Sequence, residues 1–254
     1  MFCRVGGKTK LRKQIVSKFP EHKIYVEPFV GGGSVFFEKE PAQTNVINDL
    51  DNDIYNMYVD MKKVGDTMTE YNFFPEKELF WTLMKQTEFK NDSDRLYRNL
   101  YISNNSFSGD RNSFVGPAYV KIRKKSLKNL TGKKWKTTKW KNFLNNNNVK
   151  IHNEDFASII KQYDSEDTFI YLDPPYSKSS KKDYAVGGIN PSKIFDVLQE
   201  IKSKFILSYD DCPEIKKIFS KYNIFQVETK YSRAGEINNY IGRELLISNF
   251  QLIN

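Results

Sequence analysis

Residues Thr168 to Tyr176 read Thr-Phe-Ile-Tyr-Leu-Asp-Pro-Pro-Tyr, an apolar run that ends in an acid and two prolines. The run Thr168–Leu172 has no polar face, which is typical of a strand buried at the centre of a parallel sheet. Asp173 then falls at the carboxyl end of that strand, where ligands bind in open α/β sheets. This stretch therefore predicts both a parallel sheet and the edge of the sheet that carries a site.

Strand and helix patterns alternate on both sides of this run. Further strands are expected at Ile24–Glu27, Asn45–Asn48, Val149–Asn153, Phe205–Ser208, Ile224–Thr229 and Glu244–Phe250. Apolar spacing predicts helices at Leu11–Phe19, Ile54–Met61, Phe156–Tyr163, Ile194–Ile201 and Glu214–Lys221. A short helix is also expected from Ser34, whose hydroxyl can cap it. Seven strands with helices between most of them predict a doubly wound α/β sheet. The last two strands have no helix between them, so we expect them to pair antiparallel.

The middle of the chain, residues 65–148, lacks this alternation. Helical patterns at Glu76–Phe89 and Asp94–Ile102 are followed by a loop-rich, basic stretch. We interpret residues 65–148 as an inserted domain, with Asn145–Asn148 as its exit linker, and residues 1–64 and 149–254 as one catalytic domain.

Charge is concentrated inside this insert. The formal net charge is +9, and ten basic residues without an acid fall between Lys121 and Lys141. A localised basic stretch of this kind favours a polyanion as partner. Trp135 and Trp140 are interleaved with it. The residues expected to contact phosphates are Arg123, Lys124, Lys125, Lys133 and Lys134. The alternative is a lysine-rich loop that is merely solvated.

The sequence has few of the residues that disulfide, metal or histidine-based chemistry requires. Two cysteines and two histidines do not build a disulfide framework, a zinc site or a histidine-based triad, so we expect no metal. No apolar run reaches the length of a membrane span, so we expect a cytoplasmic protein, or one that lies wherever its polyanion resides. The basic segment Met1–Phe19 resembles a transit peptide in charge only, because its apolar spacing predicts a helix of the mature fold.

The tetrapeptide Asp173-Pro174-Pro175-Tyr176 suits one chemical problem, the methylation of a ring amine. The lone pair of such an amine is delocalised into the ring. Asp173 and a neighbouring carbonyl, that of Pro174, can each accept one amine hydrogen and localise the lone pair toward an electrophilic methyl group. Prolines keep this backbone rigid, and Tyr176 can stack on the base. The alternative is a simple Pro-Pro turn after a strand.

Two more strand ends favour a nucleotide-like ligand. Glu27-Pro28-Phe29-Val30-Gly31-Gly32-Gly33-Ser34 follows the first strand, and its glycines allow close approach of a ligand to the backbone. It lacks the spacing of a phosphate-binding loop or of a dinucleotide fingerprint. Asn48-Asp49 ends the second strand, where an acid commonly binds ribose hydroxyls. Asp49 as a helix N-cap is the alternative.

Together these residues resemble the DNA adenine methylase (Dam) family, which uses S-adenosylmethionine (SAM). The resemblance rests on motifs in the family's order, namely Gly6-Gly7-Lys8, Glu27–Phe37, Asn48-Asp49, Asp155-Phe156, Asp173–Tyr176 and Arg243–Asn249. It implies a Rossmann-like seven-stranded methyltransferase sheet with an inserted, mostly helical target-recognition domain.

The resemblance also implies roles for single residues. The catalytic residues would be Asp173, Pro174, Pro175 and Tyr176. The cofactor would be bound by Gly7, Lys8, Glu27, Pro28, Phe29, Gly31, Gly32, Gly33, Asp49, Asp155, Phe156 and Asp173. Residues 106–112 are similar to the family's DNA-reading hairpin, and the DNA contacts there and at the N-terminus would be Lys8, Asn105, Arg111 and Asn112.

Arg111 is the candidate base reader, because arginine pairs bidentately with guanine; a surface-loop arginine is the alternative. The sequence thus predicts SAM-dependent N6-adenine methylation of double-stranded DNA by a monomer or weak dimer. Three alternatives stay open: cytosine-N4 methylation, RNA methylation, and a catalytically silent DNA-binding protein.

Overall fold

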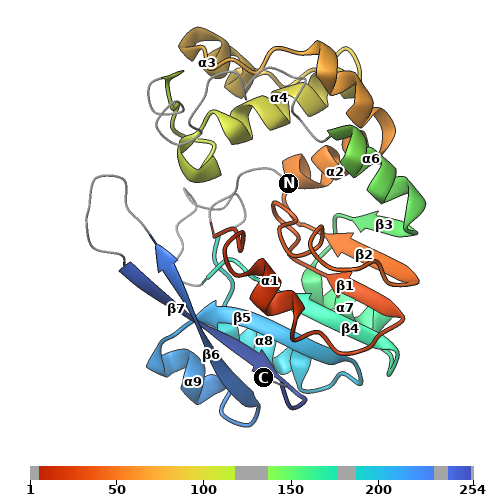
Figure 1. The fold of residues 1–254 in the computed structure, drawn as a ribbon, viewed down its shortest axis with the longest axis vertical. Coiled ribbons are helices and arrows are strands. Elements are labelled where there is room, and N and C mark those ends of the chain that lie inside the picture. Colours follow the sequence, from red (N-terminus) through yellow and green to blue (C-terminus); the bar gives the residue numbers. More distant parts are fainter. Residues whose placement is uncertain (1–5, 118–136, 177–186, 232–239, 253–254) are drawn as a thin grey trace.

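The computed structural model describes residues 6–117, 137–176, 187–231 and 240–252. Within them one seven-stranded sheet has the order β3-β2-β1-β4-β5-β7-β6 (Figure 1). Pairing is parallel from β3 to β5 and antiparallel on both sides of β7. The strands are β1 (Ile24–Glu27), β2 (Thr44–Asn48), β3 (Val149–His152), β4 (Thr168–Leu172), β5 (Lys204–Asp210), β6 (Asn223–Tyr231) and β7 (Tyr240–Ser248). The predicted α/β fold and its antiparallel last pair are confirmed.

The central strand β4 divides the core in two, because alternate side chains of a strand point to opposite faces. Phe169 and Tyr171 join one apolar cluster, and Ile170 and Leu172 join the other. The first cluster includes residues of α1 (Arg12–Val16) and α2 (Asn52–Val64). The second includes residues of α7 (Phe156–Tyr163), α8 (Pro191–Leu198) and α9 (Pro213–Ile218). Helices therefore cover both faces of the sheet (Figure 1).

Most of the remaining described helical elements lie beyond α2, away from the sheet, and the last of them leads back to β3 (Figure 1). They are η1 (Gly65–Glu70), α3 (Lys77–Lys85), α4 (Asp92–Asn104), η2 (Phe107–Gly109) and α6 (Thr137–Asn146). Buried residues of α3 and α4, Phe80 and Leu100 among them, share the apolar cluster of α2. Arg95 of α4 also donates two hydrogen bonds, of 2.8 and 2.6 Å, to the buried carboxylate of Asp60 on α2. The two predicted helices of this region are confirmed with shifted ends.

The helix expected from Ser34 is not formed. Residues 34–38 make hydrogen-bonded turns in which Phe37 N–H donates to the carbonyl of Gly33 and Glu38 N–H to that of Val35. The physical reason is burial, because Ser34, Val35 and Phe36 are all buried in succession, whereas a helix against a sheet buries only one face. Residues 34–38 therefore form turns that let successive side chains pack into the core.

The asparagine tract is not a linker. Asn145 and Asn146 end α6, and Asn147 and Asn148 make the turn into β3. The amide of Asn145 donates to the carbonyl of Lys62 at 2.8 Å, and that of Asn148 to the carbonyl of Gln43 at 3.0 Å. Amide side chains replace missing backbone partners at a turn of this kind, and here they fasten it to the sheet half of the molecule.

Two glycines of the loop after β1 offer a matched test of its backbone. Gly31 and Gly33 have φ of +47° and +68°, a region that costs other residues about 1–2 kcal/mol. A Cβ on Gly33 would also overlap the Tyr58 hydroxyl, whereas one on Gly31 would meet nothing within 4 Å. We expect Gly33→Ala to lower the free energy of unfolding by about 1–3 kcal/mol more than Gly31→Ala, measured by urea denaturation. Equal losses would contradict the described packing of this loop.

Candidate active site

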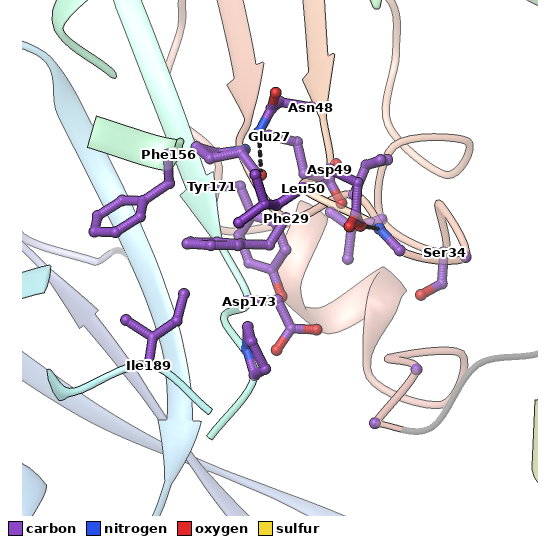
Figure 2. A pocket seen from close by; sticks show the side chains of 18 of the residues that line it. Glu27, Phe29, Ser34, Asn48, Asp49, Leu50, Phe156, Tyr171, Asp173 and Ile189 are labelled. Atoms are coloured by element: carbon purple, nitrogen blue, oxygen red, sulfur yellow. Dashed lines mark hydrogen bonds between the residues drawn. The ribbon is translucent and has the colours of Figure 1, made fainter. Parts of the chain in front are cut away.

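A cavity of about 230 Å³ lies where the parallel strands β1 to β4 end. Each strand contributes an acid at its carboxyl end: Glu27 from β1, and Asp49, Asp155 and Asp173 from just after β2, β3 and β4. Figure 2 shows Glu27, Asp49 and Asp173 converging on the cavity from separate strands. Four chain segments that are far apart in the sequence therefore form one acidic site.

Most residues predicted to bind the cofactor line this cavity. Those that do are Gly7, Glu27, Pro28, Phe29, Gly31, Gly32, Asp49, Asp155, Phe156 and Asp173; Pro175 of the predicted catalytic set joins them. Lys8, Gly33, Pro174 and Tyr176 are not among the residues that line it. Several other lining residues have no predicted role in the site, among them Leu50, Glu154, Tyr171, Ile189 and Lys193. A motif search misses these residues because no pattern marks them.

One end of the cavity is apolar. The rings of Phe29 and Phe156 lie 5.3 Å apart between centroids, and Ile189 faces them (Figure 2). The Asp155 carboxylate caps α7, with Oδ1 accepting from Ala157 N–H at 2.9 Å and Oδ2 lying 3.3 Å from the Lys193 ammonium. These contacts form a slot for a flat ring, with polar groups at its rim.

The other end is polar and negative. Asp49 is held by two backbone donors, Gly31 N–H at 2.9 Å and Asp51 N–H at 3.0 Å. The N-cap of α2 is Asp51, whose carboxylate accepts from Asp53 N–H at 2.9 Å. The N-cap alternative for Asp49 is therefore wrong, and Asp49 instead joins the glycine loop to the end of β2.

Lys8 ties the N-terminal segment to the tetrapeptide. Its ammonium lies 2.7 Å from Asp173 Oδ1, 3.1 Å from the Tyr176 hydroxyl and 3.5 Å from Glu244 Oε2. Burial alone would lower the pKa of Lys8, but these partners raise it well above its ordinary value. Burial raises the pKa of Asp173, and Lys8 opposes that rise. Lys8 therefore helps keep Asp173 ionised.

Glu244 belongs to the closing strand Arg243–Asn249, and no sequence pattern predicts a role for it. It lies on β7 beside Asp210 of β5, and this register brings it toward Lys8. Burial raises the pKa of Glu244 to about 7, although Lys8 lowers it. Only strand pairing reveals this second carboxylate, because Glu244 is remote from Lys8 and Asp173 in the chain.

Tyr176 has a ring partner of its own. It stacks on Tyr209 of β5, with centroids 4.6 Å apart and an angle of 27° between the planes. The carbonyl of Pro175 accepts from Ile189 N–H at 3.0 Å, which fixes the turn after β4. The tetrapeptide is thus held by an aromatic stack, a backbone hydrogen bond and the Lys8 ion pair.

The family comparison decides what this site belongs to. A model of the D12 class N6 adenine-specific DNA methyltransferase family matches residues 5–233. This chain belongs to that family. The adenine methylase resemblance is therefore confirmed, and the protein is an adenine-specific DNA methyltransferase.

Relatives agree over most of the chain. The chain is 26% identical to Type II methyltransferase M1.LlaDCHI of Lactococcus lactis subsp. cremoris, covering 96% of this chain and 93% of that protein. It is 28% identical to Type II methyltransferase M.MjaIII of Methanocaldococcus jannaschii over 69% of this chain and 68% of that one. It is 24% identical to the DNA adenine methylase of Vibrio cholerae, covering 95% and 93%.

The cofactor of this methyltransferase is SAM, and the cavity fits such a molecule. The aromatic slot suits an adenine ring, and the carboxylates suit hydroxyls and positive charge. Among the described lining residues the acids are Glu27, Asp49, Glu154, Asp155 and Asp173, against the single ammonium of Lys193. The described ranges contain no group of three or more His, Cys, Asp or Glu residues arranged to hold a metal ion. Their helices include none long and apolar enough to cross a membrane.

Two of the three residues predicted to contact DNA within residues 105–112 are turned toward the protein. The Arg111 guanidinium forms ion pairs with Asp53 and, at 3.6 Å, with Asp51, both at the start of α2. Its side chain is only 13% exposed, because these ion pairs hold it against the start of α2. Asn105 is fully buried, and neither of its amide atoms has a hydrogen-bond partner among the described residues. Asn112 is exposed and bonds to Asp110.

The basic stretch is described only in part. Arg123, Lys124, Lys125, Lys133, Lys134 and Trp135 lie outside the described residues. Trp140 is described, and its ring stacks on Phe37 with centroids 5.9 Å apart. The Lys141 ammonium lies 2.7 Å from the Asp66 carboxylate. The end of the stretch in α6 therefore packs on the loop that follows β1.

Proposed function

We propose that this methyltransferase transfers a methyl group from SAM to the N6 amine of an adenine rotated out of double-stranded DNA at a specific sequence. One observation carries the proposal: Asp173 of the tetrapeptide lines the same cavity as the glycine loop and the Phe29–Phe156 slot. A carboxylate that accepts an amine hydrogen beside a cofactor cavity is the arrangement that amine methylation needs.

Asp173 has the geometry of an acceptor held ready. Lys8 occupies its Oδ1 at 2.7 Å, which leaves Oδ2 to accept one hydrogen of the adenine amine. The Pro175 carbonyl is used by Ile189, so the Pro174 carbonyl is the candidate acceptor for the second hydrogen. With both hydrogens accepted, the nitrogen lone pair is localised away from the ring and toward the cavity.

Tyr176 would position the base. One face of its ring is covered by Tyr209, and an adenine on the other face would continue this stack. Rotating the base out of the duplex costs about a few kcal/mol, and stacking together with phosphate contacts offsets that cost. We assign the phosphate contacts to the basic stretch of the insert, residues 121–141, and sequence reading to residues 105–112 once DNA displaces the ion pairs of Arg111.

The methyl transfer needs no covalent enzyme intermediate. With SAM bound, the lone pair of N6 would form the new N–C bond while the S–C bond breaks and its electron pair goes to the sulfur. The surplus amine proton leaves through the acceptors at Asp173. SAM supplies an activated methyl group, so the protein supplies positioning and electrostatic stabilisation.

Product analysis tests this function. Purified protein, SAM and duplex DNA would be incubated, and the nucleosides analysed by mass spectrometry, with single-stranded DNA and RNA in parallel. We expect N6-methyladenine in duplex DNA, and direct sequencing of DNA from the expression host would give the site. N4-methylcytosine, or modification of RNA alone, would overturn the proposal. The Type II methyltransferase names of two relatives favour a defined site.

The basic stretch predicts steep salt dependence of DNA binding. Five phosphate contacts give a slope of log K against log salt of about −4 to −5. Replacing Arg123, Lys124 and Lys125 by glutamine should make that slope less steep by about 3. The matched control replaces Lys23, Lys202 and Lys204, at the amino ends of β1 and β5, and should leave the slope unchanged. A flat salt dependence of the unmodified protein would remove the phosphate-contact assignment.

A further inference from the structure

Buried side chains that do not line the cavity lie behind Glu27. Tyr25 and Glu27 are two residues apart on β1, so they lie on the same face of the sheet. The Tyr25 hydroxyl donates to Glu27 Oε2 at 2.6 Å, and both side chains are almost fully buried. Glu27 lines the cofactor cavity, whereas Tyr25 is not among the residues that line it. Tyr25 therefore acts on the cavity only through Glu27.

Lys39 is packed against the far side of Tyr25. Its ammonium lies 4.2 Å from the centroid of the Tyr25 ring, and Asn45 Oδ1 accepts from it at 2.6 Å. Asn45 is itself held by donating to the carbonyl of Asn147 at 2.7 Å. An ammonium over an aromatic face is attracted by the ring and polarises it, which makes the hydroxyl a stronger donor. Contacts thus connect Lys39 to Tyr25 and Tyr25 to Glu27, which lines the cavity.

Opposing effects set the charge of Glu27. Burial raises its pKa to about 8, the Tyr25 hydrogen bond and Lys39 lower it, and Asp173 and Asp49 raise it. Burial also lowers the pKa of Lys39 to about 8, and Glu27 opposes that change. At neutral pH the empty cavity therefore favours protonated Glu27. A cation placed against Glu27 reverses this preference, because the carboxylate then gains an opposite charge.

We propose that Tyr25 is a positioning residue for the cofactor: its hydroxyl, supported by Lys39, holds Glu27 ready to ionise, so that binding of cationic SAM expels one proton from Glu27 to solvent. This inference rests on the proposed function, in which Glu27 faces a positive group of SAM. It adds a residue outside the cavity and a proton that is released on binding. The Tyr25 hydroxyl stays a donor to Oε2, which leaves Oε1 to face the ligand.

The direction of the pH dependence follows from these charges. Below about pH 8 a proton must leave Glu27 before SAM binds, so affinity falls as the pH falls. Tyr25→Phe removes a donor that stabilises the carboxylate, so its midpoint moves to higher pH. Each unit of that movement weakens binding about tenfold at pH 7, while affinities converge at high pH. Ionisation of the SAM amine itself is common to all variants and cancels in the comparison.

Isothermal titration calorimetry with SAM tests the proposal. Titrations at pH 7 in buffers of different ionisation enthalpy count the protons released, and a series from pH 6.5 to 9.5 gives the midpoint. We expect nearly one proton for the unmodified protein, none from this site for Glu27→Gln, and weaker binding with a raised midpoint for Tyr25→Phe. Tyr101→Phe is the matched control, since its buried hydroxyl bonds to the Phe74 carbonyl at 2.8 Å in the insert.

The outcomes separate this inference from the proposed function. Failure of the unmodified, folded protein to bind SAM would contradict the proposed function itself. Normal SAM binding with the same affinity, midpoint and proton count in Tyr25→Phe would overturn only the role of Tyr25. Should Tyr25→Phe fail to fold, Glu27→Gln decides alone, because undiminished proton release in that variant would overturn the assignment to Glu27.

Discussion

Asp173→Ala is expected to lower the rate of methyl transfer by about a hundredfold to a thousandfold or more while DNA binding is largely kept. A preorganised polar group aimed at developing charge contributes about that factor to an enzyme rate. Asp173 occupies this position because it ends the fully buried strand β4 and lines the cofactor cavity. Without its carboxylate, the amine lone pair stays conjugated with the ring.

Single-turnover transfer of a radiolabelled methyl group to duplex DNA would measure the loss, and fluorescence anisotropy would measure DNA binding. Asp167→Ala is the matched control. Asp167 directly precedes β4, at the amino end of that strand and away from the cavity, and it pairs with Lys23 at the surface. We expect that control to keep its rate. Comparable rates for Asp173→Ala and the unmodified enzyme would exclude the amine-acceptor mechanism.

Lys8→Met is expected to impair both stability and activity. It leaves Asp173 and Glu244 without their shared cation in a buried site, and breaking a buried pair costs about 3–5 kcal/mol. The pKa values of Asp173 and Glu244 should both rise further, because Lys8 lowers each of them. A protonated Asp173 is a poor acceptor for the amine, so the transfer rate at neutral pH should fall and should partly recover as the pH is raised.

Urea denaturation and a pH–rate profile would measure these two effects. Lys23→Met provides the comparison, because its ion pair with Asp167 is exposed on both sides and such pairs contribute about 0–1 kcal/mol. A Lys8→Met variant with normal stability and an unshifted profile would mean that the ion pair with Asp173 has no functional role.

Local patterns predicted some elements with unchanged bounds. The run Thr168–Leu172 is β4 without a change of boundary, and Phe156–Tyr163 is α7. Patterns failed where packing overrides local preference. Ser34 was expected to start a helix because its hydroxyl can cap one, yet Ser34, Val35 and Phe36 are buried in succession. The asparagine tract resembled a linker by composition, but its amides bond to distant backbone carbonyls.

Ion pairs were the least predictable part of the site. Arg111 is predicted to read DNA, and in this structure its guanidinium pairs with Asp51 and Asp53. No sequence signal reports such a contact, because Coulomb attraction depends on distance in space and not on separation along the chain. Removing these ion pairs by substitution of Asp51 and Asp53, and then measuring DNA affinity, would show how strongly the pairs compete with DNA for Arg111.

The sequence by itself determined the order of strands and helices, the acids that follow the parallel strands, and the family, because short-range periodicity and motif order are written in adjacent residues. Only the tertiary structure decided which side chains share charge. Lys8 meets Asp173 and Glu244, and Tyr25 with Lys39 supports Glu27, because strand pairing and packing bring together residues that are far apart in the chain, and a low-dielectric interior strengthens each of those contacts.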